Sequence, residues 1–373
     1  MYCKKAHKIK YILFAIGMIF FQVTNPLGAS ADNQASLQAA TTGQGASYLT
    51  PPKTLSFCGE PLPLHERHSR EMLDREFTIA VYDRAQVIMW LKRSTRFLPF
   101  FERELKAAGL PDDLKYLPVA ESALIADIRS RAGAAGLWQF MKHTGRRQNL
   151  RISLTIDERL DPLAATRSAL QYLAFLKNKF TTWSLALAAY NCGEKRVSNA
   201  MNEQKSNDYY NLSLPQESER YLYRLAAIKI ILDNPEVYGF KLPDNQCYKP
   251  LSSEPVSLKL KNEFSLTDFA LQLGTTYFTI KKLNPHLISK QLPNGNFNLI
   301  LPKGCDRKVT TALKNLKPVP RRSSYHQPSY TVKNGDTLGA ISRRFRIPIA
   351  KLKKLNRLES SKIMVGQKLH LRH

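Results

Sequence analysis

The sequence predicts a mainly helical domain followed by two small α+β modules, each with the order strand, helix, helix, strand. Two observations support this fold class. From about residue 66 to 240, apolar residues recur at the spacing of amphipathic helices. Further along, two segments that begin at Leu266 and Leu338, 72 residues apart, repeat one pattern. The chain of 373 residues is long enough for this division, since single domains usually hold roughly 100 to 200 residues.

The N-terminus has the pattern of a secretory signal peptide at residues 1–31. Lysines precede an apolar run from Tyr11 to about Val23, and small residues follow up to Ala31. The run is shorter than the ~20 residues that cross a bilayer, which disfavours the alternative of an uncleaved membrane anchor. We therefore expect export to the periplasm or cell envelope and a soluble product after cleavage near Ala31. Peripheral contact with the membrane stays open.

Composition and periodicity divide the rest of the chain. The expected parts are a flexible leader at 32–54, the helical domain at 55–243, the first repeat at 254–303, a linker at 304–328 and the second repeat at 329–373. Breaks between helices are expected at Gly109-Leu-Pro111, from Arg131 to Gly136, at Asp161-Pro162 and at Asn234-Pro235.

The chain is strongly basic, with a formal net charge of +26 that falls to +22 when the four lysines of residues 1–31 are removed. A basic chain suggests an anionic partner, most often nucleic acid. Here lysine and arginine are spread over every segment without a platform of aromatic residues among them, which is typical of a solvated surface. Export argues the same way, so we expect no nucleic-acid partner.

Four cysteines follow the signal peptide: Cys58, Cys192, Cys247 and Cys305. An oxidising compartment permits disulfides, and three full pairings are open. Cys58 and Cys247 bracket the helical domain, so a bond between them is one hypothesis. No Cys-x-x-Cys or His-x-x-x-His spacing indicates a metal, and no glycine-rich loop indicates a nucleotide, so no cofactor is expected.

Glu121 is a candidate for acid and base chemistry. The segment from Pro111 to Ala123 is predicted to be one helix that starts on a proline and two aspartates, and its apolar residues lead directly to Glu121. Apolar surroundings disfavour the carboxylate anion, raise its pKa and suit the group to donate and then accept a proton. Spacing alone, however, favours a surface or capping glutamate.

Two further motifs change this interpretation of Glu121-Ser122. They are Ser130-Arg-Ala-Gly-Ala-Ala-Gly-Leu-Trp-Gln-Phe-Met141 and Ala188-Ala-Tyr-Asn-Cys-Gly193. Together, the three motifs resemble the ordered signatures of the lytic transglycosylase (SLT) domain, which has a goose-type lysozyme-like fold. The similarity is closest to the membrane-bound murein transglycosylase D type, and it extends from about Phe57 to Pro243.

The resemblance implies roles for individual residues. Glu121 matches the catalytic acid and base. The implied substrate-binding residues are Ser122, Ser130, Gly136, Gln139, Met141, Tyr190, Asn191, Glu217 and Tyr221. In the family, the tyrosine that Tyr190 matches has its hydroxyl close to the catalytic carboxylate. This chain departs from the family pattern at Ser218, where threonine is usual, and at Cys192, which we interpret as a packed thiol.

The resemblance also implies a mechanism with one carboxylate, whereas hydrolytic glycosidases generally use two. Glu121 would protonate the oxygen between N-acetylmuramic acid and N-acetylglucosamine in peptidoglycan glycan strands. Attack by the muramyl C6 hydroxyl would then form a 1,6-anhydro end without water. A muramidase that adds water and a catalytically silent wall-binding protein are the alternatives, and the presence of Glu121 argues against the silent one. No protein partner is predicted.

The second repeat carries its own resemblance. Tyr330-Thr-Val-Lys-Asn-Gly-Asp-Thr-Leu338, with Asn356, resembles a LysM module, a βααβ domain that binds N-acetylglucosamine polymers. Residues 335–337 are expected to cap its first helix. The first repeat has Glu263-Phe-Ser-Leu266 in place of Gly-Asp-Thr-Leu and is interpreted as a degenerate LysM-like module. For this module, sugar binding and bracing of the catalytic domain both stay open.

Overall fold

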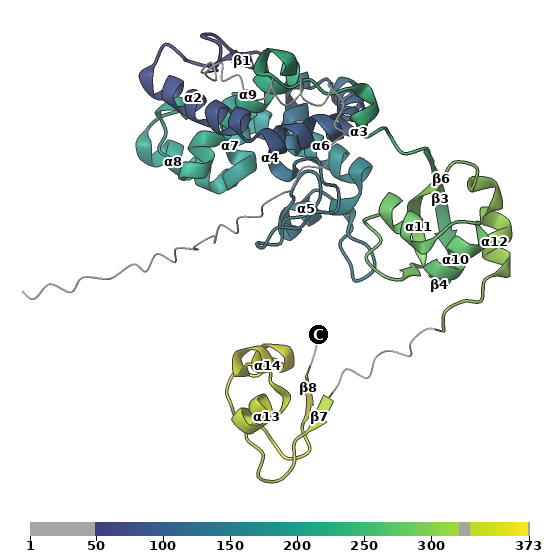
Figure 1. Cartoon of the computed structure of the whole chain (residues 1–373). Coiled ribbons are helices and arrows are strands. Elements are labelled where there is room, and N and C mark those ends of the chain that lie inside the picture. Colours follow the sequence, from purple (N-terminus) through teal and green to yellow (C-terminus); the bar gives the residue numbers. More distant parts are fainter. Residues whose placement is uncertain (1–48, 321–328, 372–373) are drawn as a thin grey trace, which may run out of the picture. The chain divides into compact units, whose positions relative to one another are not determined.

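The computed structural model describes residues 49–320 and 329–371 (Figure 1). The expected signal peptide, the leader up to residue 48 and the linker residues 321–328 lie outside the described residues. The described residues build three hydrophobic cores. The first includes residues from 57 to 240, the second residues 258–312 together with Ile156, and the third residues 332–371. No helix of the described part is long and apolar enough to span a bilayer.

The first core belongs to a helical domain. A short hairpin of β1 (Ser56–Phe57) and β2 (Glu60–Pro61) precedes the helices α2 (Arg67–Tyr82), α3 (Arg84–Ala108), α4 (Leu117–Ser122), α5 (Lys142–Arg147), α6 (Pro162–Phe180), α7 (Trp183–Cys192), α8 (Glu194–Gln204) and α9 (Gln216–Asp233). Short 3-10 helices lie at Asp112–Tyr116, Glu158–Leu160, Tyr209–Asn211, Pro235–Tyr238 and Asp244–Gln246. The mainly helical fold is as predicted.

Two buried helices form the centre of this domain. Residues Trp183–Ala189 of α7 are all buried, and α7 packs against α6, α8 and α9. Helix α9 is buried along most of its length and also packs against α2 and α4. A helix that is apolar on nearly all sides, as α7 is, belongs in the interior. The position of α9 matters for function, because it brings residues from the end of the domain against α4.

The helix ends follow from local chemistry. Helix α3 ends where Gly109 adopts φ +65°, and its N–H bonds the Leu105 carbonyl. Helix α6 begins where the Asp161 carboxylate accepts hydrogen bonds from the N–H groups of Leu163 and Ala164. Helix α9 ends before Asn234-Pro235. These three expected breaks are confirmed, and the fourth, from Arg131 to Gly136, lies between α4 and α5 as expected.

The single helix predicted from Pro111 to Ala123 is wrong in one respect. Residues Asp112–Tyr116 form a 3-10 helix, and α4 begins only at Leu117. The reason is Pro118, which has no N–H to continue an α-helical ladder back to Leu114. Leu117 instead donates to the Leu114 carbonyl, and Pro118 occupies the first turn of a new helix.

The second core belongs to the first repeat. Its elements are β3 (Ser253–Leu260), β4 (Phe264–Ser265), α10 (Leu266–Gln272), α11 (Tyr277–Leu283), β5 (Gln291–Leu292), β6 (Gly295–Pro302), a 3-10 helix at Asp306–Lys308 and α12 (Val309–Asn315). Strands β3 and β6 pair antiparallel from Ser253 opposite Pro302 to Leu260 opposite Gly295, and β4 pairs with β5. We call residues 253–316 the brace module below.

The linker expected at 304–328 is too long and needs correction. Helix α12 lies within it and buries Val309 and Ala312 in the core of the brace module, with Leu313 and Leu316 packed beside them. These four residues recur at the spacing of one helical face, a signal that the proline and serine content of the segment obscured.

The third core belongs to the second repeat, with β7 (Ser329–Thr331), α13 (Leu338–Phe345), α14 (Ile349–Asn356) and β8 (Lys368–His370). Strands β7 and β8 pair antiparallel. As predicted for residues 335–337, a side chain caps the first helix, and it is Thr337 that accepts the N–H of Ala340. The second repeat therefore has the expected βααβ order, and the first has the same order with one additional short strand on each side of the helices, β4 and β5.

The two repeats share one asparagine contact. In the brace module, Asn284 donates to the Ile300 carbonyl at 2.7 Å and accepts the Ile300 N–H at 2.7 Å. In the second repeat, Asn356 makes the same pair of bonds with His370, at 2.9 and 2.6 Å. Each asparagine thus fastens the second helix to the last strand.

The described cysteines are all free thiols, so the disulfide considered between Cys58 and Cys247 is not formed. Cys58 is buried beside the N-terminal hairpin, where its N–H bonds the Asp113 carboxylate at 2.7 Å. Cys247 is half-buried after the last 3-10 helix of the domain, with its thiol directed to the Pro243 carbonyl. Cys192 is half-buried against the first core, as interpreted from the sequence.

The asparagine contacts predict unequal stability effects. Asn284 is fully buried, so Asn284→Ala leaves the N–H and carbonyl of Ile300 without a partner and should cost about 2 to 3 kcal/mol of local stability. Asn356 is half-buried and water can replace it, so Asn356→Ala should cost about 1 kcal/mol. Amide hydrogen exchange at Ile300 and at His370 measures both effects, and equal costs would contradict this account.

Candidate active site

Glu121 lies in the last turn of α4, where the helix packs against α9. The helix ends at the next residue, Ser122, because Ala123 and Leu124 both adopt positive φ, +49° and +60°. The Glu121 side chain is half-buried. Tyr221, which is buried on α9, donates a hydrogen bond from its hydroxyl to Glu121 Oε1 at 2.5 Å. The carboxyl group is therefore held between two helices that are 100 residues apart in sequence.

The environment of Glu121 raises its pKa to about 7. Burial is the main cause, because it disfavours the charged form. The hydrogen bond from Tyr221 acts in the opposite direction, while the negative charge of Glu217 raises the pKa and the positive charge of Arg224 lowers it. At neutral pH both protonation states of Glu121 are therefore populated. A raised pKa was expected from the apolar residues that precede Glu121 in the sequence.

Glu217, Tyr221 and Arg224 occupy one face of α9, four and three residues apart. Glu217 is exposed in the first turn of the helix, and Arg224 is half-buried with its Nε 3.3 Å from Glu76 Oε2. Arg224 was not among the residues predicted from the sequence. Its spacing from Tyr221 is the signal that would have placed it toward Glu121, since residues three apart on a helix share a face.

The loop of residues 128–141 carries the second motif. It is closed by backbone bonds from Gly136 N–H to the Ile128 carbonyl and from Ala135 N–H to the Phe140 carbonyl. The hydroxyl of Ser130 accepts the N–H of Ala134 at 3.0 Å and so shapes the turn. Gln139 adopts φ +46°, and its side-chain amide donates to the Gly136 carbonyl at 2.8 Å. Met141 is exposed at 37%.

Gly136 is required by packing. It has φ +80°, and a Cβ atom there would lie 1.8 Å from the carbonyl oxygen of Arg159. No side chain fits so close to a backbone atom. The glycine therefore allows the loop to lie directly on the segment that contains Arg159, which is a different role from the sugar contact implied by the motif.

The third motif ties the loop and α9 to α7. The hydroxyl of Tyr190 donates to the Trp138 carbonyl at 2.8 Å. Ser218 donates to Asn191 Oδ1 at 2.7 Å and so fastens α9 to the end of α7. The serine makes this bond although the family usually has threonine at this position. Tyr190 lies near enough to Glu121 that the carboxylate charge, after burial, raises the pKa of the phenol. Its hydroxyl, however, is bonded elsewhere.

The predicted site residues are thus only partly brought together. Tyr221 bonds Glu121, and the charges of Glu121 and Glu217 act within the same group of residues, which includes Tyr190. The hydrogen bond to the carboxylate comes from Tyr221 rather than from Tyr190, because α9 presents that hydroxyl directly to α4. Ser122 points into the interior and donates to the Pro118 carbonyl at 2.8 Å, a buried arrangement that does not favour contact with a sugar.

Comparison with known proteins finds two domain families in this chain. Residues 99–213 match the transglycosylase SLT domain and residues 330–372 match the LysM domain. The chain is 30% identical over 290 residues to the membrane-bound lytic murein transglycosylase D of Escherichia coli K12, which covers 74% of this chain. The chain spans 63% of that relative's length.

More distant relatives match shorter stretches. The peptidoglycan transglycosylase gp16 of Escherichia phage T7 is 33% identical over 131 residues, which is 34% of this chain and 10% of that protein. Among solved structures, the 70 kDa soluble lytic transglycosylase of Escherichia coli is 17% identical over 48% of this chain and 32% of that chain, with a TM-score of 0.33. The chain therefore contains a segment that matches the transglycosylase SLT domain and, after it, one that matches the LysM domain, and it is similar to a lytic transglycosylase over most of its length.

Proposed function

We propose that this chain is a peptidoglycan lytic transglycosylase, which cleaves the β-1,4 bond between N-acetylmuramic acid and N-acetylglucosamine and leaves a 1,6-anhydro end. The observation that carries the proposal is the state of Glu121. Its carboxyl is half-buried, it accepts a hydrogen bond from Tyr221, and its pKa is about 7. A group with this pKa donates and accepts protons efficiently at neutral pH.

In the first step, protonated Glu121 donates its proton to the glycosidic oxygen as the bond to C1 breaks. Positive charge develops at C1, and the 2-acetamido group of the same sugar stabilises it. Glu121 becomes ionised in this step. The Tyr221 hydroxyl stabilises the new carboxylate, because a hydrogen bond to the charged form favours it, and Arg224 adds a favourable charge.

In the second step, ionised Glu121 takes the proton of the muramyl C6 hydroxyl, whose oxygen attacks C1 and closes the anhydro ring. The carboxyl group returns to its protonated state, so one residue serves as acid and then as base without consuming water. Ser130, Gln139, Met141, Tyr190 and Asn191 line or support the sugar groove in this proposal. Ser122 and Gly136 contribute packing, as their contacts indicate.

Hydrolysis by the same domain is the second candidate, and one observation favours it. Glu217 is exposed, and its charge acts on Glu121. A second carboxylate near the acid is what a muramidase needs to activate water. The two reactions are separated by their products, since the anhydro end is lighter than the hydrolysed end by one water molecule.

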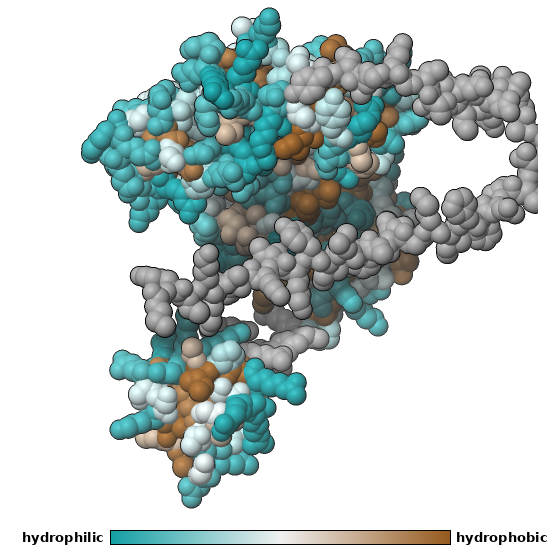
Figure 2. All heavy atoms as spheres, turned by 60° about the vertical axis from the view of Figure 1, so that its left-hand side comes forward, coloured by the Kyte–Doolittle hydropathy of each residue, from teal (hydrophilic) through white to brown (hydrophobic). Residues whose placement is uncertain are grey.

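We further propose that the protein is exported through the signal peptide at residues 1–31, acts in the cell envelope and is held on the wall by its LysM domain. The domain exposes apolar side chains at Ile349, Met364 and Val365, and apolar residues are visible on its surface in Figure 2. Exposed apolar groups next to polar loops suit the faces of N-acetylglucosamine rings.

The catalytic assignment predicts the effect of Glu121→Gln. Digestion of purified peptidoglycan sacculi by wild type should release anhydromuramyl products, and the variant should be slower by roughly 10² to 10⁴, the usual contribution of a general acid. Mass spectrometry of the products checks both points. Reducing-end products from wild type would make the protein a muramidase, and no products from wild type would support a binding protein without activity.

The raised pKa of Glu121 predicts a matching effect on stability. Wild type keeps its proton to about pH 7 when folded but loses it near pH 4.5 when unfolded, so stability falls between these values as pH rises. Glu121→Gln has no such loss. Its Tm should exceed that of wild type by a few degrees at pH 8 and equal it at pH 4. A lower Tm at both pH values would indicate a damaged fold.

The neighbours of Glu121 predict opposite shifts of the pH profile. The acid step needs protonated Glu121, so activity should fall as pH rises through about 7. Tyr221→Phe removes a bond to the carboxylate and should move this limb to higher pH, with lower kcat. Glu217→Gln removes a nearby negative charge and should move it to lower pH. The pH dependence of kcat measures both shifts. Shifts of the two variants in the same direction would contradict this account of the Glu121 pKa.

The LysM assignment predicts which apolar residue binds the wall. Val365→Asp should weaken binding to sacculi about tenfold and leave cleavage of soluble glycan fragments unchanged. Phe278→Asp is a matched control, because Phe278 is equally exposed on the brace module, at 67% against 66%. Sedimentation with sacculi measures both. If only Phe278→Asp weakens binding, the wall is bound by the brace module instead.

A further inference from the structure

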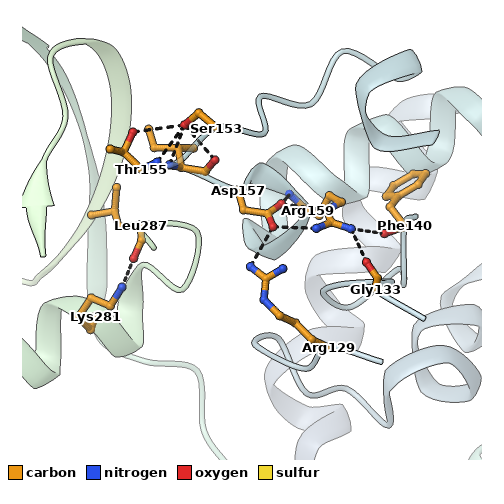
Figure 3. Close-up of polar contacts among 10 residues, drawn as sticks. Arg129, Gly133, Phe140, Ser153, Thr155, Asp157, Arg159, Lys281 and Leu287 are labelled. Atoms are coloured by element: carbon orange, nitrogen blue, oxygen red, sulfur yellow. Dashed lines mark hydrogen bonds and ion pairs between the residues drawn. The ribbon is translucent and has the colours of Figure 1, made fainter. Parts of the chain in front are cut away.

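Asp157 and Arg159 form a buried ion pair behind the loop of residues 128–141 (Figure 3). Both are at most 4% exposed. The guanidinium binds the carboxylate through two hydrogen bonds, from Nε to Oδ1 and from Nη2 to Oδ2, each 2.9 Å long. Burial alone would raise the pKa of Asp157, but the charges of Arg159 and Arg129 outweigh it and keep the group ionised. Neither residue belongs to a motif that is recognisable in the sequence.

Arg159 uses its remaining donor group to hold the loop at two points. Its Nη1 donates to the Gly133 carbonyl at 2.7 Å and to the Phe140 carbonyl at 2.9 Å, as Figure 3 shows. These carbonyls stand on either side of Gln139 and Gly136 in the sequence. The Phe140 carbonyl also accepts the N–H of Ala135, so the guanidinium completes the closure of the loop.

Two further contacts fix the same loop. Arg129, in its first part, bonds Asp157 Oδ2 at 2.8 Å. The backbone of Gly136 lies directly on the Arg159 carbonyl, where no side chain fits. Three contacts with residues 157–159 therefore hold the loop: the hydrogen bonds from Arg159, the ion pair of Arg129 with Asp157, and the backbone packing of Gly136 on Arg159.

The segment that carries this pair is in turn held by the brace module. Asp157 N–H donates to the His286 carbonyl at 2.9 Å, and Ile288 N–H donates to the Thr155 carbonyl at 2.9 Å. Between them, Ile156 is 1% exposed and belongs to the core of the brace module, opposite Leu287. The catalytic domain thus contributes a side chain to the core of its neighbour, one residue before Asp157.

We propose that Arg159 is a positioning residue for the reaction, which it does not touch, and that the brace module serves to keep Asp157 and Arg159 in place. This inference rests on the proposed transglycosylase function. Arg159 sets the backbone from Gly133 to Phe140 and so the position of Gln139, which the proposed function assigns to the sugar groove. A bidentate, buried guanidinium is suited to this because its planar donors fix direction as well as distance.

The test compares Arg159→Lys and Arg159→Met with Lys229→Met, at a temperature well below each Tm. Lys229 is a matched control, because it forms an ion pair with Asp113, also largely buried, on other elements. Misplacement by about 1 Å costs roughly 10²-fold in rate. We expect kcat per folded molecule to fall about 100-fold for Arg159→Met and about 10-fold for Arg159→Lys, which keeps the charge. Lys229→Met should lose stability but keep kcat.

Amide hydrogen exchange provides a readout that does not depend on activity. In Arg159→Lys, the amides of Ala135 and Gly136 should exchange faster than in wild type, while the amides of α7 and α9 keep their protection. A uniform rise in exchange over the whole domain, or a wild-type kcat in both Arg159 variants, would overturn the proposal. If Arg159→Met does not fold, Arg159→Lys and the variants below still decide.

The role of the brace module is tested within one short loop. Ile156→Ala removes the side chain buried in the module, whereas Leu154→Ala, two residues earlier, changes a side chain that is 94% exposed. We expect faster exchange at Ala135 and Gly136 and a several-fold lower kcat for Ile156→Ala only. Equal behaviour of the two variants would remove the module from the proposal. If wild type releases no anhydro products, the proposed function fails, and the exchange data still report on positioning.

Discussion

The cost of placing a carboxyl group against apolar surroundings is the constraint on which this structure depends. An ionised group loses favourable hydration when it is buried, and the pKa of Glu121 rises to about 7 for this reason. To act as a base as well as an acid, Glu121 must also be able to lose its proton. Tyr221 and Arg224 on α9 provide the compensation that allows the carboxylate to form. In the proposed reaction, the close packing of α4 on α9 therefore takes part, because it places the Tyr221 hydroxyl against the Glu121 carboxyl group.

The contact between α4 and α9 also depends on the apolar interior of the domain. Helix α9 packs against α4 and against α7, which is buried from Trp183 to Ala189. Polar contacts at the ends of these helices then set their register. Ser218 on α9 bonds Asn191 on α7, and Tyr190 on α7 bonds the Trp138 carbonyl in the loop. The motif residues thus act largely by holding one another in place.

The two repeats show how one βααβ fold acquires different contacts. Asn284 and Asn356 make equivalent bonds, so the scaffold is common to both. The brace module includes Ile156 of the catalytic domain in its core and adds α12. The second repeat keeps the Gly-Asp-Thr-Leu turn and exposes Met364 and Val365. A module that receives a neighbour's side chain in its core is suited to bracing, and one with exposed apolar loops is suited to binding.

The sequence by itself determined the helical class of the first domain, the helix ends at Gly109 and Asp161, the βααβ order of both repeats and Glu121 as the candidate acid. Caps, periodicity and motifs are local signals, because they depend on residues a few positions apart. Only the tertiary structure decided that Tyr221 rather than Tyr190 bonds Glu121, that Ser122 faces inward, and that Arg159 closes the loop around Gln139. These contacts join residues that come together only when helices and loops pack, and periodicity alone does not specify that packing.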